Sequence, residues 1–321
     1  MKQRNFGLIR ENILDPRDWK FGGYTGIENE VLCSDGQWDL WLPPLEIQRN
    51  DYFETMACVS FACANAIEAL LNRKYSLDRN YSDRALAKMS GTKRTGNEMS
   101  IVANTARDFG LMLERYWEFD REAIKTWDEF YAEIPNEIKQ KTEDFLEDYE
   151  LKWEWVYSPN PEKIKEALTY APLATAIYAY TPTDANGYYT RADYWPNHLV
   201  LLYGYEDGKY WKIYDQYNNC YKKMAWDFNF GAKLKFNITK RGTTMPKYQF
   251  DNNTLLQLVE QGTERHNFGM ILDGKLIVDE LDKLIASWIV RNNGNLVNKV
   301  RAVTLEVWQS FPKISLKKEA L

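Results

Sequence analysis

The residue types that could carry out nucleophilic catalysis begin with His198, one of only two histidines among 321 residues. His198 stands directly before the apolar run 199–205, which is typical of a buried strand. Asp215 follows a second strand-like segment, 209–214, and a hairpin through 206–208 would bring Asp215 back beside His198. A neighbouring carboxylate fixes the tautomer of an imidazole and stabilises its charged form. The spacing therefore predicts the histidine and carboxylate of a catalytic triad.

Cys58 is the matching nucleophile candidate. From Cys58 onward apolar residues recur at helical spacing, and the stretch 49–55 before it is polar, so Cys58 is predicted at the start of a helix. Unpaired N–H groups at a helix start lower the pKa of a thiol. Taken alone, a free cysteine is more often a small buried hydrophobe, and a lone histidine is more often structural. The ordered set of Cys58, His198 and Asp215 is much less expected by accident.

These residues give the chain a resemblance to the papain-like cysteine peptidases. Cys58-Val59-Ser60-Phe61-Ala62 is similar to the family's Cys-Trp-Ala-Phe-Ser, and Asn197-His198-Leu199-Val200 is similar to its Asp-His-Ala-Val. Asp215-Gln216-Tyr217 stands where the family usually has Asn-Ser-Trp. The resemblance covers roughly residues 40 to 240 and implies an α+β fold. In this fold a helical lobe carries the cysteine and an antiparallel β lobe carries the histidine, with the active site between them.

The chain departs from the family pattern around the oxyanion hole. The family has a glutamine six residues before the nucleophile, where this chain has Tyr52. Gln48, ten residues before Cys58, is assigned by resemblance as the oxyanion donor, across an insertion of four residues. The backbone N–H of Cys58 would be the second donor. Asp215 replaces the family's asparagine, and both residue types can accept from the imidazole N–H.

The resemblance implies a peptidase that forms an acyl-enzyme on Cys58 and needs no metal or organic cofactor. Two alternatives stay open. One is a peptidoglycan amidase or endopeptidase, which the separation of 140 residues between Cys58 and His198 disfavours. The other is a papain-like scaffold or docking component of a large assembly, such as a phage virion, with partners bound through the C-terminal domain. Zymography on bacterial walls and on casein separates the two enzymes, and a Cys58→Ala variant separates either of them from a scaffold.

Composition narrows the classes of partner and location. The net charge of −5 with no basic run disfavours nucleic acid, so the expected partner is a protein or peptide substrate. The four cysteines are sparse and do not have the pattern of a disulfide framework or a zinc site. This favours a reducing compartment. No stretch has the apolar length of a signal peptide or a transmembrane helix. These features predict a protein of the cytoplasm or a virion, without membrane contact.

Three parts are predicted along the chain: an N-terminal strap over 1–45, a catalytic domain over 46–242 and a small C-terminal domain over 243–321. Helices are expected at 58–73, 82–90, 98–109 and 161–170, with a charged helical insertion near 120–150. In the C-terminal part we expect a hairpin over 268–278 with an Asp-Gly turn, followed by a helix over 279–291. His266 is expected in a polar loop before that hairpin, in a surface or capping role.

Overall fold

The computed structural model divides into two compact units, Met1–Lys240 and Arg241–Leu321. It describes residues 6–10, 20–21, 27, 29–191, 194–217 and 219–241 of the chain, and the backbone of five strands beyond them. The separate strap and the domain boundaries expected from the sequence stay predictions. Among the described residues, no helix combines the length and apolarity that crossing a membrane requires.

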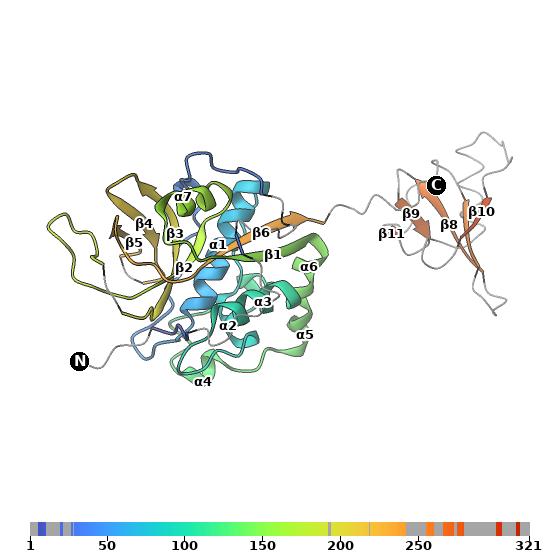
Figure 1. Cartoon of the computed structure of the whole chain (residues 1–321). Coiled ribbons are helices and arrows are strands. Elements are labelled where there is room, and N and C mark those ends of the chain that lie inside the picture. Colours follow the sequence, from blue (N-terminus) through green and yellow to red (C-terminus); the bar gives the residue numbers. More distant parts are fainter. Residues whose placement is uncertain are drawn as a thin grey trace. The chain divides into compact units, whose positions relative to one another are not determined.

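The helices of the first unit are mostly short. In chain order they are η1 (Asp39–Trp41), α1 (Cys58–Tyr75), α2 (Asp83–Met89), α3 (Met99–Phe109), η2 (Glu114–Tyr116), α4 (Trp127–Phe130), α5 (Asn136–Lys139), η3 (Gln140–Thr142), α6 (Glu143–Asp148) and α7 (Pro161–Tyr170). Helices α2 to α6 collect on one side of the long central α1, whereas α7 lies apart from them (Figure 1). The four predicted helices correspond to α1, α2, α3 and α7 and are confirmed. The stretch predicted as a helical insertion consists of short helical segments, α4 and then α5, η3 and α6 in direct succession after Pro135.

Helix α1 is the core of the first unit. Fourteen of its eighteen residues, Cys58 to Leu71, are buried, and all of these but Asn65 and Glu68 are apolar or small, as is expected of a helix packed on all sides. It ends at Ser76, whose left-handed φ of 55° lets its N–H close the last turn on Asn72. α1 packs against β2, β3 and β6 of the sheet and against α2 and α3. It therefore joins the helical lobe to the strands.

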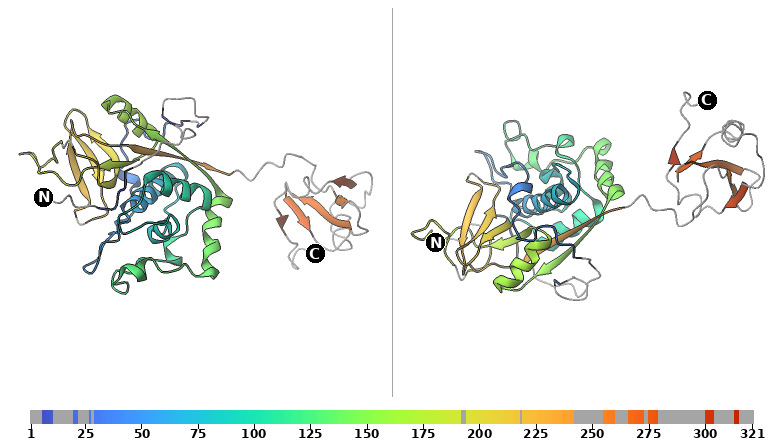
Figure 2. Two further views of the ribbon diagram at one scale, coloured as in Figure 1. Left: turned by 60° about the horizontal axis from the view of Figure 1, so that its bottom comes forward. Right: turned by 90° about the horizontal axis from the view of Figure 1, so that it is seen from above.

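A six-stranded antiparallel sheet forms the other half of this unit (Figure 2). Its strand order is β1-β6-β2-β3-β4-β5. Its strands are β1 (Tyr149–Val156), β2 (Leu173–Ile177), β3 (His198–Glu206), β4 (Tyr210–Tyr214), β5 (Tyr221–Ala225) and β6 (Lys233–Lys240). Every residue of β2 and the first seven of β3 are buried, because these strands lie in the middle of the sheet and face α1. The predicted α+β arrangement of helical lobe and antiparallel β lobe is confirmed.

The second unit contains a five-stranded sheet in the order β10-β7-β8-β9-β11. Its strands are β7 (Leu255–Val259), β8 (His266–Leu272), β9 (Lys275–Val278), β10 (Val300–Val303) and β11 (Lys313–Ile314). The predicted hairpin is confirmed as β8 and β9. The loop position expected for His266 is wrong, because β7 extends the ladder upstream and pairs Val259 with His266. The helix expected over 279–291 lies outside the described residues.

Candidate functional site

The two strands β3 and β4 bring His198 and Asp215 together as the hairpin predicts. His198 is the first residue of β3, and Asp215 follows the last residue of β4, across the ladder that pairs Leu201 with Tyr214. Gly208, at a φ of 69°, is in the turn between the two strands. His198 Nε2 lies 2.8 Å from Asp215 Oδ1, and both side chains are fully buried. The carboxylate thus holds one ring nitrogen, and Nδ1 is left for proton exchange.

Cys58 lies at the first position of α1, close to the start of β3. The backbone N–H of Leu199, the residue after His198, is near enough to the thiol to act on its pKa. The Nδ1 atom of His198 is buried and has no hydrogen-bond partner among the described residues. The structure therefore brings all three predicted residues into one buried cluster, with the helix supplying the thiol and the hairpin supplying the imidazole and carboxylate.

Two further side chains hold the outer oxygen of Asp215. Lys222 Nζ donates to Asp215 Oδ2 at 2.8 Å, and the hydroxyl of Tyr180 donates to the same oxygen. Burial alone raises the pKa of a carboxyl, but His198 and Lys222 outweigh it and hold the pKa of Asp215 below its ordinary value. Asp215 is therefore an ionised carboxylate with all of its charge compensated locally.

The expectation of a lowered thiol pKa is wrong for this conformation. Burial raises the pKa of Cys58 well above its ordinary value, and the carboxylates of Asp215 and Glu54 add to the shift. The backbone N–H of Leu199 acts in the opposite direction but is the weaker influence. Desolvation of a thiolate outweighs the partial charge of a helix start when no water reaches the sulfur. The thiol is therefore protonated while the site is closed.

Gln48, the predicted oxyanion donor, lies at the edge of this cluster but its amide is occupied. Gln48 is fully buried, and its Nε2 donates to Glu54 Oε1 at 3.2 Å and to the Tyr217 hydroxyl at 2.5 Å. The Tyr217 ring lies 5.5 Å from the His198 ring. Tyr52, at the spacing that the family uses, is 61% exposed and outside the cluster. Gln48 can serve an oxyanion only after Glu54 or Tyr217 releases its amide.

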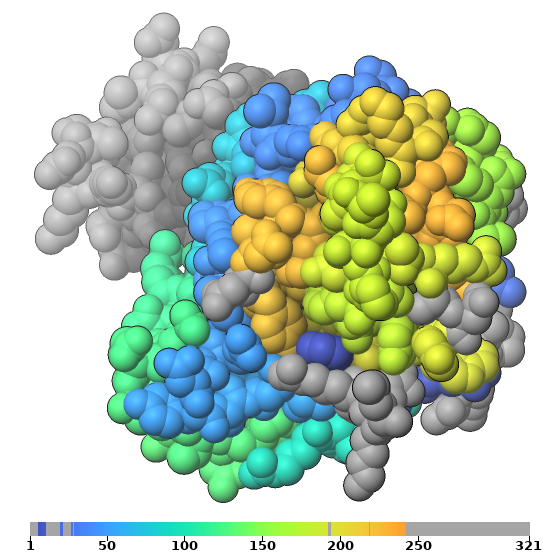
Figure 3. Space-filling model, turned by 90° about the vertical axis from the view of Figure 1, so that its left-hand side faces the viewer, coloured from blue at the N-terminus to red at the C-terminus, as the bar shows by residue number. Residues whose placement is uncertain are grey.

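A short N-terminal segment, residues 6–10, covers the cluster. Phe6 is buried, with its ring 5.3 Å from the His198 ring, and its N–H donates to the Asn197 carbonyl at 3.2 Å. On the helical side, Asn97 donates from its backbone to Gly7 O and accepts from Ile9 N–H, both at 2.9 Å. The segment is hydrogen-bonded to both lobes, and its dark blue surface lies between them in Figure 3. Solvent is excluded from His198 by this contact.

Two glycines permit this close approach. Gly7, at a φ of 110°, would place a Cβ 2.4 Å from the carbonyl oxygen of Met56. Gly96, at a φ of 101°, would place one 1.9 Å from the carbonyl oxygen of Gly7. Met56 itself, two residues before Cys58, has a φ of 58°, a left-handed conformation that is strained for a side chain of its size. Any side chain at position 7 or 96 would therefore push the segment away from the site.

Sequence reasoning missed four residues of this cluster: Phe6, Glu54, Tyr180 and Lys222. Lys222 had a signal, because it alternates with Met224 on the inward face of β5, where an unpaired cation is not tolerated. Gly7 beside Phe6 was a weak hint of close packing. Glu54 and Tyr180 lie in irregular segments, and no local pattern marks where their side chains go.

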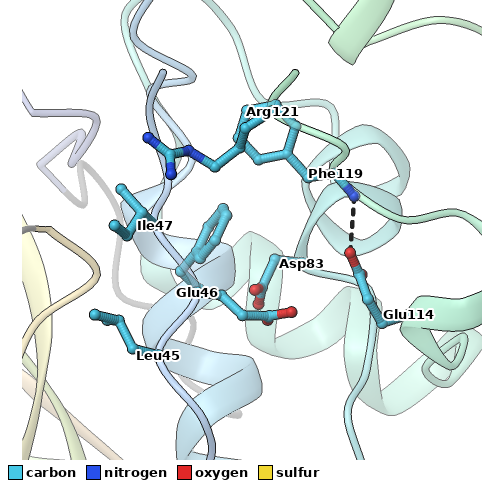
Figure 4. A pocket seen from close by; sticks show the side chains of 8 residues that line it. Leu45, Glu46, Ile47, Asp83, Glu114, Phe119 and Arg121 are labelled. Atoms are coloured by element: carbon cyan, nitrogen blue, oxygen red, sulfur yellow. Dashed lines mark hydrogen bonds between the residues drawn. The ribbon is translucent and has the colours of Figure 1, made fainter. Parts of the chain in front are cut away.

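A second group of ionisable side chains lies inside the helical lobe, where three acids and one arginine line a pocket (Figure 4). A pocket of about 240 Å³ is lined by Leu45, Glu46, Ile47, Phe61, Asp83, Glu114, Phe119 and Arg121. Burial and neighbouring carboxylates raise the pKa of Asp83 well above its ordinary value and that of Glu114 to about 7. Among the described residues, no three His, Cys, Asp or Glu side chains are placed to hold a metal ion.

Comparison with solved structures identifies the fold. The chain is similar to xylellain, a cysteine protease from Xylella fastidiosa, at 16% identity over 73% of this chain and 97% of that one, with a TM-score of 0.50. It is also similar to digestive procathepsin L 3 of the Tenebrio molitor larval midgut, at 19% identity over 64% of this chain and 70% of that one, with a TM-score of 0.45. No family model and no curated protein matches the sequence. The protein has the papain-like cysteine protease fold.

Proposed function

We propose that this protein is a cysteine peptidase that cleaves peptide bonds through Cys58, His198 and Asp215. The observation that carries the proposal is the 2.8 Å contact between His198 Nε2 and Asp215 Oδ1, beside a cysteine at the start of a buried helix. His198 takes the proton of the Cys58 thiol through Nδ1 while Asp215 holds the ring and stabilises the imidazolium. The thiolate attacks the peptide carbonyl, and His198 returns the proton to the leaving amine. Water then releases the acyl group.

The oxyanion of the tetrahedral intermediate needs donors that are already in place. The backbone N–H of Cys58 is one, and the Gln48 amide is the second once Tyr217 or Glu54 turns away from it. Displacement of residues 6–10 would open the space above His198 for substrate and readmit water to the thiol. The return of water would lower the pKa of Cys58, because burial is the first cause of its elevation.

The test compares hydrolysis of casein and of a mixed fluorogenic peptide set by the full chain, a Gly7→Ala variant and a Cys58→Ala variant. Cys63→Ala is the matched control, because Cys63 is an equally buried cysteine five residues along the same helix. We expect hydrolysis with the full chain or with Gly7→Ala that Cys58→Ala abolishes and Cys63→Ala leaves intact. Hydrolysis that survives Cys58→Ala contradicts the proposal, as does its absence from both the full chain and Gly7→Ala.

A further inference from the structure

Lys222 forms an ion pair with the triad carboxylate, and unlike a surface ion pair it is almost completely buried. Its side chain is 5% exposed, and it donates to Asp215 Oδ2 at 2.8 Å and to the Asn219 carbonyl at 2.7 Å. Asp215 has no exposed surface and uses its other oxygen for His198. The two oxygens of one carboxylate thus connect an imidazole on one side with a buried ammonium on the other. A buried ammonium is destabilising unless an opposite charge is paired with it, and here Asp215 is that partner.

We propose that Lys222 is a positioning residue of the catalytic site: it cancels the charge of Asp215, so that Asp215 orients His198 without adding a net negative charge to the Cys58–His198 pair. The residue type at 215 gives the reason. A carboxylate accepts from the imidazole as an amide would, but it also favours the imidazolium and disfavours the thiolate. The raised pKa of Cys58 includes such a contribution from Asp215. A buried cation on the far oxygen offsets that contribution while leaving the hydrogen bond intact.

The charged and titratable groups around His198 leave this role to Lys222. Asp215 and Cys58 belong to the triad, and Tyr180 and Tyr217 lie within 6.0 Å ring-to-ring distance of His198. Burial raises the pKa of both phenols, so they are neutral donors and acceptors. Glu54 lies on the Gln48 side and carries the opposite charge. Lys222 is the one cation that the described side chains present to Asp215 besides the histidine itself.

The experiment measures how Lys222→Met changes the titration of His198, using histidine-labelled full chain and NMR. His266, the other histidine, is in the second unit and is the internal reference. We expect the midpoint pH of the His198 ring resonances to rise by about one unit in Lys222→Met, because a nearby positive charge is lost. Lys223→Met is the matched control: it removes the same charge from the next residue of β5, which faces outward. No shift in a folded Lys222→Met variant, or an equal shift in Lys223→Met, overturns the proposal.

A double variant keeps the test decisive if Lys222→Met unfolds. Asp215→Asn alone leaves the ammonium without its counter-ion, and Lys222→Met alone leaves the carboxylate without it, whereas Asp215→Asn with Lys222→Met leaves neither. We expect the urea midpoint of the double variant to exceed that of Asp215→Asn, and its His198 midpoint pH to lie higher than in Asp215→Asn. Equal values in the two variants overturn the proposal.

The catalytic readout rests on the proposed peptidase function, whereas the NMR readout does not. With an active peptidase, the acid limit of kcat/KM should move upward in Lys222→Met together with the His198 midpoint, because His198 must be neutral to take the thiol proton, while Lys223→Met leaves it in place. An unmoved acid limit in an active Lys222→Met variant overturns the proposal. If every variant and the full chain lack hydrolysis, the peptidase assignment fails, and the His198 titration still decides the role of Lys222.

Discussion

Two buried aspartates of the same unit titrate in opposite directions. Asp215 is fully buried and Asp83 is 3% exposed, so both carboxyls have lost nearly all contact with water. The pKa of Asp215 is held below its ordinary value, because His198 and Lys222 overcome the effect of burial. The pKa of Asp83 is raised by burial and then by Glu46. Burial is common to both sites, so the sign of the neighbouring charges decides which aspartate stays ionised.

The two clusters also differ in access. The acidic cluster lines a pocket of about 240 Å³, and the Asp83 Oδ1 atom has no hydrogen-bond partner among the described residues. The catalytic cluster is covered by Phe6, and Cys58 and His198 have no exposed surface. The site whose charges are balanced is therefore closed, and the site whose charges are unbalanced has room for water. Excluding water from a cluster of carboxylates without counter-charges would raise the energetic cost of burying them. A cluster whose charges are paired can be buried at a smaller cost.

The largest expected difference is between Asp215→Asn and Asp83→Asn, the same substitution in the two clusters. Asp215→Asn strands the Lys222 ammonium without a counter-ion and should lower the free energy of unfolding by about 3–5 kcal/mol at neutral pH. Asp83→Asn removes a carboxyl whose charged form is already disfavoured by burial and by Glu46, and should change the free energy of unfolding by less than about 1 kcal/mol. Urea denaturation at pH 7 measures both. Equal losses would mean that charge balance does not distinguish the clusters.

How far the sequence predicts these clusters depends on whether a contact is local. His198 and Asp215 are seventeen residues apart, and the hairpin that joins them can be predicted from strand alternation and one turn. Helix α1 follows equally from its spacing of apolar residues. Phe6 on His198 and Tyr180 on Asp215 join segments without regular structure, so no periodicity marks them. The thiol pKa was predicted in the wrong direction because helix position is visible in a sequence and burial by a distant segment is not.

The next effect concerns the pH dependence of stability in the acidic cluster. Burial, then Glu46, raises the pKa of Glu114 from 4.5 to about 7. The folded protein thus holds this proton more tightly than the unfolded chain does. The contribution of Glu114 is complete below about pH 4.5 and is lost as the pH rises through about 7, a change of about 3 kcal/mol. Urea midpoints between pH 4.5 and 8 should fall more steeply for the wild-type protein than for Glu114→Gln.

Glu122→Gln is the control for this pH series, because Glu122 is an exposed glutamate of the same stretch of chain. Its pH dependence should match the wild-type protein. A Glu114→Gln variant as pH-sensitive as the wild-type protein would assign the slope to other groups and remove Glu114 from the comparison.

A smaller effect is expected from opening the closed cluster with Gly7→Ala. The new Cβ would lie 2.4 Å from the Met56 carbonyl oxygen, and a φ of 110° is itself unfavourable for alanine. A shift of about 1.4 kcal/mol toward the displaced segment would raise the rate of Cys58 alkylation by roughly tenfold. Iodoacetamide labelling near pH 6, read by mass spectrometry, measures it. Gly187→Ala is the control, because Gly187 has a φ of 80° and no neighbour within 4 Å. Equal labelling of Cys58 in both variants would mean that residues 6–10 do not control the access of reagents to Cys58.

The smallest effect should come from Tyr180→Phe, which removes a hydrogen bond to Asp215 but no charge. Lys222 still donates to the same oxygen, so the carboxylate stays compensated, and we expect a loss of only about 0.5–1 kcal/mol in urea denaturation. Tyr189→Phe is the control, since its ring packs on Tyr180 at 4.9 Å. Charge compensation predicts a small loss for Tyr180→Phe and a large one for Lys222→Met. If the two losses are equal, the number of donors holds Asp215 ionised, and the contrast with Asp83 reflects hydrogen bonding instead of charge.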